Sequence, residues 1–592
     1  MATTLMIFAA LPFAISFAAC IAARKDGKYP KYIALAAALA TLAIAVGVLL
    51  SPAAEYNVVW FSAGSVQFTI NLASYAMNKL LLVLVAVMAP IIIIYSFGMV
   101  NTYSEQGRYY SLLSLFTAAM VLFSITNGMI TLLISWALLG ITSYLLIGFW
   151  YSKPGPAPAA RKAITIITIG DLSMLGGVIM VWMGYHTFSF TQILSSGSSP
   201  YLAPAMLLML IGAFTKCAQF PFNGWLPDAM EGPTPISAFL HSSTMVKAGV
   251  FLVAVLLPLI IKANLAALLV IVGGITALIG AVNAISETHI KKVLAYSTLE
   301  DIGLMFIALG FLGVPAAMLL FFVQTFYKSL LFLSAGSAMK ANPGEESIKN
   351  IYGLRNNSLL FWSTAAASLS LIGIFPLSGF FGKAAVVSAA SGSILGFVLL
   401  AVLQLLSSVY MLRWLYFLSR TPPKEARAKS AVDYRILPNS MIAAGVAVLV
   451  LLLAASFYPV YLSGFMGWKI NIGLAASVIF AVIIAAGAGI VYAVYVHGRA
   501  QMRMPNWVPS ISHPNAAVDK AYDLLSYAAM ALAGLAAVGE IYISKLEGCI
   551  YGATAWLGRK IGFSENGQVG TYLFAVILGF AIISALLLLV FA

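Results

Sequence analysis

The chain has 592 residues, of which 62% are hydrophobic and only 8% are charged, and its mean hydropathy is +0.99. This composition excludes a soluble globular protein and a disordered one, and it predicts a single large bundle of membrane-spanning helices. The formal net charge of +14 does not indicate a nucleic-acid partner, because most lysines and arginines fall in alternate short loops, as in membrane proteins that follow the positive-inside rule.

The three cysteines, Cys20, Cys217 and Cys549, lie far apart and form neither a CxxC pair nor a cluster with histidine. An iron–sulfur cluster and a disulfide framework are therefore not expected. The chain also lacks a sequence pattern for flavin, nicotinamide or metal binding, so we predict no cofactor, no metal site and no redox chemistry within it.

Long apolar runs predict about sixteen membrane-spanning helices in an all-α polytopic protein. The runs lie near residues 4–22, 31–51, 77–99, 110–126, 129–151, 162–184, 203–220, 235–260, 264–285, 290–312, 314–340, 360–386, 393–418, 438–458, 470–497 and 570–591. The first run has no basic residue before it and is followed by Arg24, Lys25 and Lys28. We interpret it as a span with its N-terminus outside, not as a signal peptide.

The charges of the connecting loops test this count, because one helix more or fewer would scramble their alternation. All basic loops fall on one side of the predicted bundle, and they are 23–31, 152–162, 286–292, 340–356 and 419–437. The loops of the opposite side carry almost no lysine or arginine, and they are 52–74, 184–202 and 312–315. We expect the basic side to be cytoplasmic, both termini to lie outside, and the membrane to be a prokaryotic cytoplasmic membrane.

Two further segments are not expected to cross the membrane. Residues 52–74 alternate around a turn and predict a small external β-hairpin. Residues 515–560 are rich in alanine, leucine, isoleucine and tyrosine, but charged side chains recur through them. This pattern favours a long amphipathic helix lying along the membrane or along neighbouring subunits, and an additional span is the alternative.

Two Phe-Pro pairs interrupt long apolar runs, with Lys216 before Pro221 and Lys383 after Pro376. The two interrupted helices are the seventh and the twelfth predicted spans, which are five positions apart. Because this number is odd, the units that contain them have opposite orientations, which is typical of inverted five-helix repeats with an ion site at the broken helices. The predicted domains are N-terminal helices with the external hairpin at 1–105, a first repeat at 106–262, a second repeat at 263–420, C-terminal helices at 421–500, the lateral helix at 501–562 and a final anchor at 563–592.

The stretch from Lys216 to Lys247 places two lysines and His241 in apolar sequence that four prolines interrupt. A charge inside a bilayer is costly, so ionisable residues in such a place are candidates for function. Two alternatives remain open. Lys216 could extend its amine to the membrane interface, and His241 could be a core residue with satisfied hydrogen bonds.

Two more lysines lie in apolar sequence, Lys328 in mid-span and Lys383 after the second break. A desolvated lysine can be charged or neutral depending on one nearby partner, which is the property that a proton relay needs. A row of such lysines linked by water could pass protons along the membrane. The alternative for Lys383 is an amine satisfied by the unwound carbonyls of the break.

Three acidic residues are candidate partners for these lysines: Asp171, Glu300 and Asp301. Adjacent residues on a helix point about 100° apart, so only one of Glu300 and Asp301 is expected to face any given lysine. Asp171 could instead pair with a cation in a loop. Lys291 and Lys292 precede the helix of Glu300, and ordinary cytoplasmic anchoring is one interpretation of them.

Four stretches of the sequence resemble the signature motifs of one family. They are GWLPDAMEGPTPISAFLHSSTMVKAGVFL, IKKVLAYSTLEDIGLMFIALG, FYKSLLFLSAGS and IGIFPLSGFFGK. The chain is similar over about residues 70–420 to the antiporter-like subunits that respiratory complex I, Mrp-type antiporters and membrane-bound hydrogenases share. The span count, the lateral segment and NGQVGTYL near the C-terminus make it most similar to the largest, distal subunit of complex I.

This resemblance implies roles for individual residues. Lys216 corresponds to the central lysine of the first half-channel and His241 to the connecting histidine. Lys328 corresponds to part of the central axis, and Lys383 to the terminal lysine of the second half-channel. Asp171 matches the Gly-Asp pair in the family's sixth span.

The sequence departs from the family pattern at several positions. Ala137 stands where the fifth span usually has the glutamate that partners the first lysine. Gln324 and Leu320 replace histidines, and Ala384 and Ala385 replace acidic residues after the terminal lysine. Either another carboxylate takes over, from Asp171, Glu300 or Asp301, or the channel is partly degenerate and the subunit is mainly structural.

The predicted function is proton translocation by an antiporter-like membrane subunit of a redox-driven complex. The expected partners are other membrane subunits, including further antiporter-like ones, in an NADH-, deazaflavin- or ferredoxin-linked quinone oxidoreductase or an energy-converting hydrogenase. A sodium/proton antiporter subunit of Mrp type is the first alternative, although the lateral helix argues against a free-standing antiporter. A structural subunit that does not pump is the second.

Overall fold

The structure, a computed structural model, describes residues 2–23, 29–64, 66–100, 103–421, 437–466 and 474–496. All of these residues belong to one unit, Met1–His513, and a second unit comprises Pro514–Ala592. The predicted lateral helix and the final anchor lie outside the described residues, as do Arg24, Lys25, Lys28 and most of the loop 419–437.

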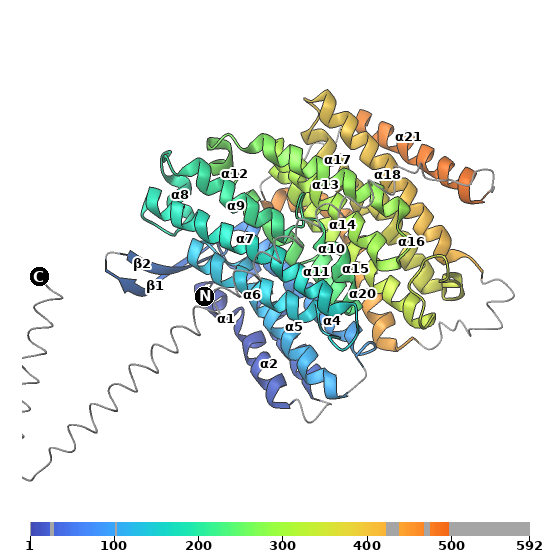
Figure 1. Cartoon of the computed structure of the whole chain (residues 1–592), viewed down its shortest axis with the longest axis horizontal. Helices are drawn as coiled ribbons and strands as arrows, with labels where there is room; N and C mark the ends of the chain where they lie inside the picture. Colours follow the sequence, from blue (N-terminus) through green and yellow to red (C-terminus); the bar gives the residue numbers. More distant parts are fainter. Residues whose placement is uncertain are drawn as a thin grey trace, which may run out of the picture. The chain divides into compact units, whose positions relative to one another are not determined.

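The described residues are mostly helical (Figure 1). The first helices are α1 (Ala2–Phe8), α2 (Leu11–Ala22), α3 (Pro30–Leu50), α4 (Ala76–Ser96), α5 (Tyr103–Ser124), α6 (Met129–Ile147), α7 (Pro156–Tyr185) and α8 (Phe190–Ser195). The others are α9 (Leu202–Lys216), α10 (Trp225–Asp228), α11 (Thr234–Ser242), α12 (Met245–Lys262), α13 (Ala266–Ser286), α14 (Ile290–Gly310), α15 (Val314–Ala341), α16 (Ser358–Ile372), α17 (Ser378–Ala389), α18 (Ile394–Ser419), α20 (Asn439–Met466) and α21 (Leu474–Val491).

Twelve helical stretches among the described residues are long and apolar enough to cross a membrane. Leu202–Lys216 and Ser358–Ile372 are shorter apolar helices, and each ends at a predicted break. The protein is therefore an integral membrane protein with a helical fold, as predicted. The total of sixteen spans stays a prediction, because the run 570–591 lies outside the described residues.

A β-hairpin follows α3, as predicted for residues 52–74. Its strands β1 (Glu55–Ala63) and β2 (Val66–Ala73) pair antiparallel, and the hairpin projects from the helices in Figure 1. Glu55 fixes its base, because its carboxylate accepts hydrogen bonds from Tyr75 and, at 2.7 Å, from the Thr191 hydroxyl.

Both predicted helix breaks are present. α9 ends at Lys216 before Pro221, and α16 ends at Ile372 before Pro376; both Phe-Pro peptide bonds are cis. Backbone carbonyls at a break inside a membrane need partners from within the protein. The Trp225 indole donates to the Thr215 carbonyl at 2.9 Å at the first break, and the Gln404 amide donates to the Ile372 carbonyl at the second.

A further interruption was not predicted. The apolar run 235–260 was predicted as one helix, but α11 ends at Ser242 and α12 begins at Met245. The Ser243 and Thr244 hydroxyls both donate to the Phe239 carbonyl, at 3.3 and 2.7 Å. Side-chain hydroxyls that bond nearby carbonyls offer the backbone an alternative to helix geometry, and an apolar pattern does not reveal this competition.

The helices differ strongly in burial. The most apolar stretch of α15 is entirely buried and that of α14 is 94% buried, whereas that of Val478–Tyr495 is only 17% buried. α14 and α15 pack against each other and lie within the body of the unit in Figure 1. Polar side chains on these two helices are therefore shielded from lipid by other helices.

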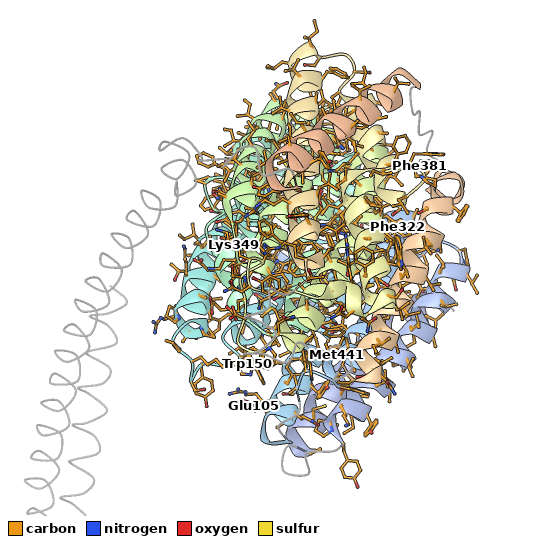
Figure 2. All side chains as sticks on the ribbon, turned by 90° about the vertical axis from the view of Figure 1, so that its right-hand side faces the viewer. Glu105, Trp150, Phe322, Lys349, Phe381 and Met441 are labelled. Atoms are coloured by element: carbon orange, nitrogen blue, oxygen red, sulfur yellow. The ribbon has the colours of Figure 1, made fainter. Side chains whose placement is uncertain are left out.

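Several helices begin or end at the same end of the bundle. Figure 2 shows Glu105, Trp150 and Met441 toward its lower end. A hydrogen bond joins two of these helix ends: near the start of α5, the Arg108 guanidinium donates to the Phe149 carbonyl, just after α6, at 2.6 Å. Trp150 and Met441 flank the basic loops 152–162 and 419–437, which are predicted to lie on one side of the membrane.

Candidate ion-translocation site

The five candidate cationic side chains are buried inside the bundle. Lys216, His241, Lys247 and Lys328 have no exposed surface, and Lys383 is 3% exposed. None of these lysines extends its amine to the surface, so the interfacial alternative for Lys216 is wrong. Amines at such positions need partners within the protein.

Lys216 forms an ion pair with Asp171. Its Nζ lies 3.3 Å from Asp171 Oδ1 and donates to the Trp136 carbonyl at 3.0 Å. The lysine is completely buried, whereas a quarter of the Asp171 side chain is exposed. The pair forms because α7 and α9 pack side by side. Asp171 therefore pairs with Lys216 and not with a loop cation.

The second ion pair lies deeper, between α14 and α15. Lys328 Nζ is 3.2 Å from Asp301 Oδ2, and both side chains are fully buried. Lys328 also donates to the Ser297 hydroxyl, and the Tyr327 hydroxyl donates to the same Asp301 oxygen at 3.1 Å. Both charges are thus paired, and Asp301 Oδ2 is also hydrogen-bonded, whereas Asp301 Oδ1 has no hydrogen-bond partner among the described residues.

Glu300 faces a different lysine from Asp301, as predicted from their adjacent positions. Its carboxylate accepts hydrogen bonds from the Ser407 hydroxyl and, at 2.6 Å, from the Tyr410 hydroxyl. Lys383 Nζ donates to the same Ser407 hydroxyl at 3.0 Å. Lys383 is therefore linked to Glu300 through one intervening side chain.

Lys247 has no carboxylate partner among the described residues. Its Nζ donates to the Phe321 carbonyl at 2.5 Å and to the Thr325 hydroxyl at 2.6 Å. Thr325 is one helical turn before Lys328 on α15, so the two lysines approach the same helix. Lys247 is held by neutral acceptors, whereas its neighbour Lys328 has a carboxylate.

His241 has a different environment from the lysines. Neither ring nitrogen has a hydrogen-bond partner among the described residues, and its ring lies 6.4 Å from the Trp225 ring and 5.9 Å from the Phe332 ring. The alternative of a core histidine with satisfied hydrogen bonds is therefore wrong within this structure. Buried Gln324, at a position where the family has histidine, also lacks a partner. Unpartnered buried polar atoms of this kind are suited to bound water.

Several participants were not singled out from the sequence. Ser407 and Tyr410 on α18 contact Glu300, and Ser297 and Thr325 contact lysines. Their one sequence signal is on α18, where residues 407 and 410 are three apart and share a helix face. Lys291 is buried and donates to the Met230 and Gly232 carbonyls, so its amine stabilises the loop before α11.

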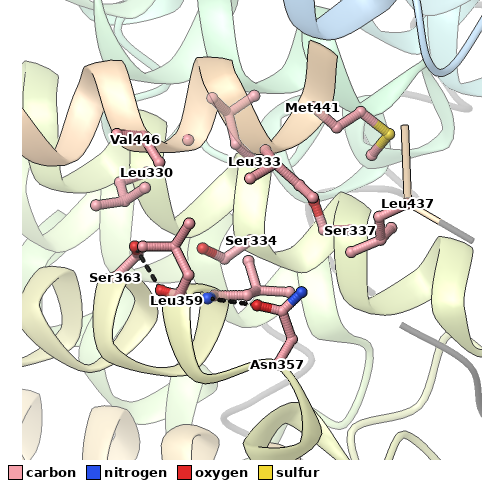
Figure 3. A pocket seen from close by; sticks show the side chains of 13 residues that line it. Leu330, Leu333, Ser334, Ser337, Asn357, Leu359, Ser363, Leu437, Met441 and Val446 are labelled. Carbon is pink, nitrogen blue, oxygen red and sulfur yellow. Dashed lines mark hydrogen bonds between the residues drawn. The ribbon is translucent and has the colours of Figure 1, made fainter. Parts of the chain in front are cut away.

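A cavity between α15, α16 and α20 lies further along α15 than Lys328 (Figure 3). The polar side chains that line it are Ser334, Ser337, Asn357 and Ser363, among leucines and Met441. No acidic, basic or histidine side chain lines it, so the cavity adds no titratable group to the buried lysines and carboxylates described above. Among the described residues, no three histidine, cysteine or acidic side chains are arranged to hold a metal ion.

Comparison with known proteins places these residues in a family. Residues 126–408 match the family described as NADH:quinone oxidoreductase/Mrp antiporter, TM. NADH-quinone oxidoreductase subunit L of Mycobacterium tuberculosis (strain CDC 1551 / Oshkosh) is 35% identical over 403 residues, which are 65% of this chain and 64% of that protein. Subunit L of Rickettsia bellii (strain RML369-C) is 36% identical over 371 residues, 59% of this chain and 57% of that protein. The chain thus spans less than two thirds of these curated relatives.

Two solved structures share the fold. A chain of the Mrp complex from Dietzia sp. DQ12-45-1b superposes with a TM-score of 0.74 at 22% identity, covering 99% of this chain and 63% of that one. A chain of the membrane-bound sulfane sulfur reductase, an archaeal respiratory membrane complex, gives 0.68 at 19% identity, covering 81% of this chain and 99% of that one. All eight candidate ionisable residues fall within 126–408, the region that matches the NADH:quinone oxidoreductase/Mrp antiporter family.

Proposed function

We propose that this protein is a proton-translocating, antiporter-like subunit of a redox-driven membrane complex. One observation carries the proposal: three fully or almost fully buried lysines, Lys216, Lys328 and Lys383, are each linked to a carboxylate, although the usual acidic positions of the family are alanines. Keeping such groups buried is costly unless each charge is compensated.

The geometry suits proton transfer because each pair has two electrostatic states. When a lysine and its carboxylate are both charged they attract, and when a proton moves from one to the other both become neutral and the attraction disappears. A neighbouring charge can therefore favour one state over the other. Lys247, held by neutral acceptors next to Lys328, is placed to transmit such an influence.

We assign the first half-channel to residues 106–262 and the second to 263–420, in opposite orientations. The two interrupted helices support this assignment, since each has a buried lysine near its break. The basic loops support a cytoplasmic side at one end of the bundle, with both termini on the outer side. Lys216 and Asp171 then serve the first half-channel, and Lys383 and Glu300 the second.

The energy source and the partners lie in other subunits under this proposal. Relatives named NADH-quinone oxidoreductase subunit L support a complex I type host with quinone as acceptor. The likeness to a chain of an Mrp complex keeps sodium/proton exchange as the competing function. Transport that requires sodium in vesicles would favour that alternative, whereas transport that persists without sodium favours protons.

The test is proton transport by the whole complex in sealed vesicles, with Lys216→Ala and Lys383→Ala in separate variants. We expect each variant to lose most of its transport while electron transfer by the partner subunits can still be assayed. Lys262→Ala is the matched control, because this exposed lysine contacts only the Ser196 carbonyl at 3.1 Å among the described residues. Unchanged transport in both test variants would instead support a structural subunit.

A further inference from the structure

A hydroxyl group connects Lys383 to a carboxylate, in contrast to the direct ion pairs of Lys216 and Lys328. Ser407 Oγ accepts a hydrogen bond from Lys383 Nζ at 3.0 Å and donates to Glu300 Oε1. No ion pair of Lys383 occurs within the described part of the chain. Ser407 therefore lies between the two groups in a continuous hydrogen-bonded line.

The Ser407 hydroxyl has a second acceptor available. Its oxygen also lies 2.9 Å from the Leu403 carbonyl, one turn earlier on α18. A serine hydroxyl donates one proton and accepts through two lone pairs. It can therefore point to Glu300 or to the Leu403 carbonyl, but not fully to both. The hydroxyl can thus point to Glu300, the orientation in which a proton could pass to the carboxylate, or to the Leu403 carbonyl, the orientation in which it could not.

The surroundings offer few other routes for a proton. Glu300 and Ser407 are fully buried, and the small pocket beside Glu300 and Lys383 is lined mostly by apolar side chains, among them Leu304, Val386 and Phe480. Gln404 also lines this pocket, and its amide is held by the Ile372 carbonyl. The hydroxyl of Ser407 is thus the polar group that stands between lysine and carboxylate.

We propose that Ser407 carries protons between Lys383 and Glu300, an inference that rests on the proposed function. In the transfer, an Nζ–H bond of Lys383 breaks as a new Oγ–H bond forms on Ser407. The original Oγ–H bond breaks as Glu300 Oε1 gains that proton. Lysine and carboxylate both become neutral, serine is unchanged, and the reverse sequence restores the charges.

Tyr410 is the positioning residue of this unit. Its buried hydroxyl donates to Glu300 Oε2 at 2.6 Å, which leaves Oε1 turned to Ser407. Residues 407 and 410 lie on one face of α18, so a single helix orients both carboxylate oxygens. Tyr410 does not contact Lys383 in the described hydrogen bonds, so it acts through Glu300.

The test compares Ser407→Ala with Ser407→Thr in the intact complex in sealed vesicles. Alanine removes the hydroxyl, and we expect proton transport to fall about 10²-fold, the lower end of what a positioned proton carrier contributes. Threonine keeps a hydroxyl, and we expect it to retain most of the transport and its solvent deuterium isotope effect. Loss of transport in both variants with normal assembly, or wild-type transport in Ser407→Ala, would overturn the proposal.

Ser408→Ala is the matched control for this experiment. Ser408 is the next residue on α18, is equally buried, and its hydroxyl donates to the Gln404 carbonyl at 2.9 Å without contacting Glu300. We expect this variant to transport protons normally. Lys383→Ala distinguishes the carrier role of Ser407 from the proposed function of the subunit. If Lys383→Ala stops transport and Ser407→Ala does not, the carrier role is wrong and the proposed function stands.

An infrared measurement tests the position of Tyr410. Tyr410→Phe removes the hydrogen bond to Glu300 Oε2, so we expect the carboxyl band assigned to Glu300 by its loss in Glu300→Gln to shift in frequency. Ser408→Ala should leave this band in place. An unshifted band in Tyr410→Phe would show that the tyrosine does not orient the carboxylate.

Discussion

The two broken helices hold their lysines in different ways. Lys216, at the first break, touches its carboxylate directly at 3.3 Å, and a quarter of the Asp171 side chain is exposed. Lys383, after the second break, reaches Glu300 only through Ser407, and that carboxylate is fully buried. A direct pair near the surface and a bridged pair in the interior therefore serve corresponding places in the two proposed half-channels.

The difference shows that the carboxylate linked to a lysine can lie on different helices of the two units, on α7 for Lys216 and on α14 for Lys383. In the predicted pairing of the repeats, α6 and α14 are the second helices of their units, and they carry Ala137 and Glu300. The third helices, α7 and α15, carry Asp171 and Lys328. A missing glutamate in one motif is therefore weak evidence for a degenerate channel, because a neighbouring helix can supply the carboxylate.

The largest effect is expected from Asp301→Asn. It leaves Lys328 buried without a carboxylate, which costs about 3–5 kcal/mol for a fully buried pair and should stop proton transport. Thermal unfolding and vesicle transport measure the two effects. Asp228→Asn is the control, because its pair with Lys162 lies at 2.8 Å but is partly exposed. Equal losses in both variants would contradict the role of burial.

Asp171→Asn is expected to lose stability less than Asp301→Asn does. A quarter of this side chain lies outside the protein interior, whereas Asp301 is fully buried, so the pair of Asp171 is less enclosed by the protein. Proton transport should still fall strongly, since Lys216 loses its carboxylate. Wild-type transport by Asp171→Asn would show that the first unit passes protons without this acid.

A smaller effect is expected from Gly140→Ala. A Cβ atom at this position would lie 3.2 Å from both Asp171 Oδ2 and Lys216 Nζ, so the ion pair must shift by a few tenths of an ångström. We expect transport to slow without loss of the fold. Gly176→Ala is the control, since its Cβ would meet only Leu208, at 3.4 Å. Identical rates in the two variants would contradict a tight pair at Gly140.

The smallest effect is expected at the surface pair of His289 and Glu346, 3.1 Å apart. A hydrogen bond from His289 holds the pKa of Glu346 below its usual value. The contribution is therefore present above the usual glutamate pKa and is lost as the pH falls through the lowered one. Because Glu346 is 60% exposed, Glu346→Gln should change the free energy of unfolding by less than about 1 kcal/mol. A larger change would show that exposed pairs rival buried ones here.

The sequence predicted the features that depend on apolar runs and their interruptions. The helix ends near Pro221 and Pro376, the hairpin and the different partners of Glu300 and Asp301 all follow from local sequence patterns. The choice of Asp171 as the partner of Lys216 could not be predicted, because it depends on α7 and α9 packing side by side.

The hydroxyl groups of the site were harder to predict. Ser407 and Tyr410 carry no charge, and hydroxyl side chains are frequent in membrane helices, where they commonly bond a carbonyl of their own helix, as Ser408 does. The helix break at Ser243 and Thr244 was not predicted for the same reason, because their hydroxyls also bond a nearby carbonyl. Packing between helices gives Ser407 its partners outside α18, Glu300 on α14 and Lys383 on α17.

The most direct test of the central claim is the proton transport of the assembled complex with Glu300→Gln. This change keeps the size of the side chain and removes its charge and its capacity to take up a proton. We predict that proton transport by this subunit stops in Glu300→Gln while electron transfer in the partner subunits continues. Transport at the wild-type rate would contradict the claim that a buried carboxylate works with each buried lysine, here Glu300 with Lys383.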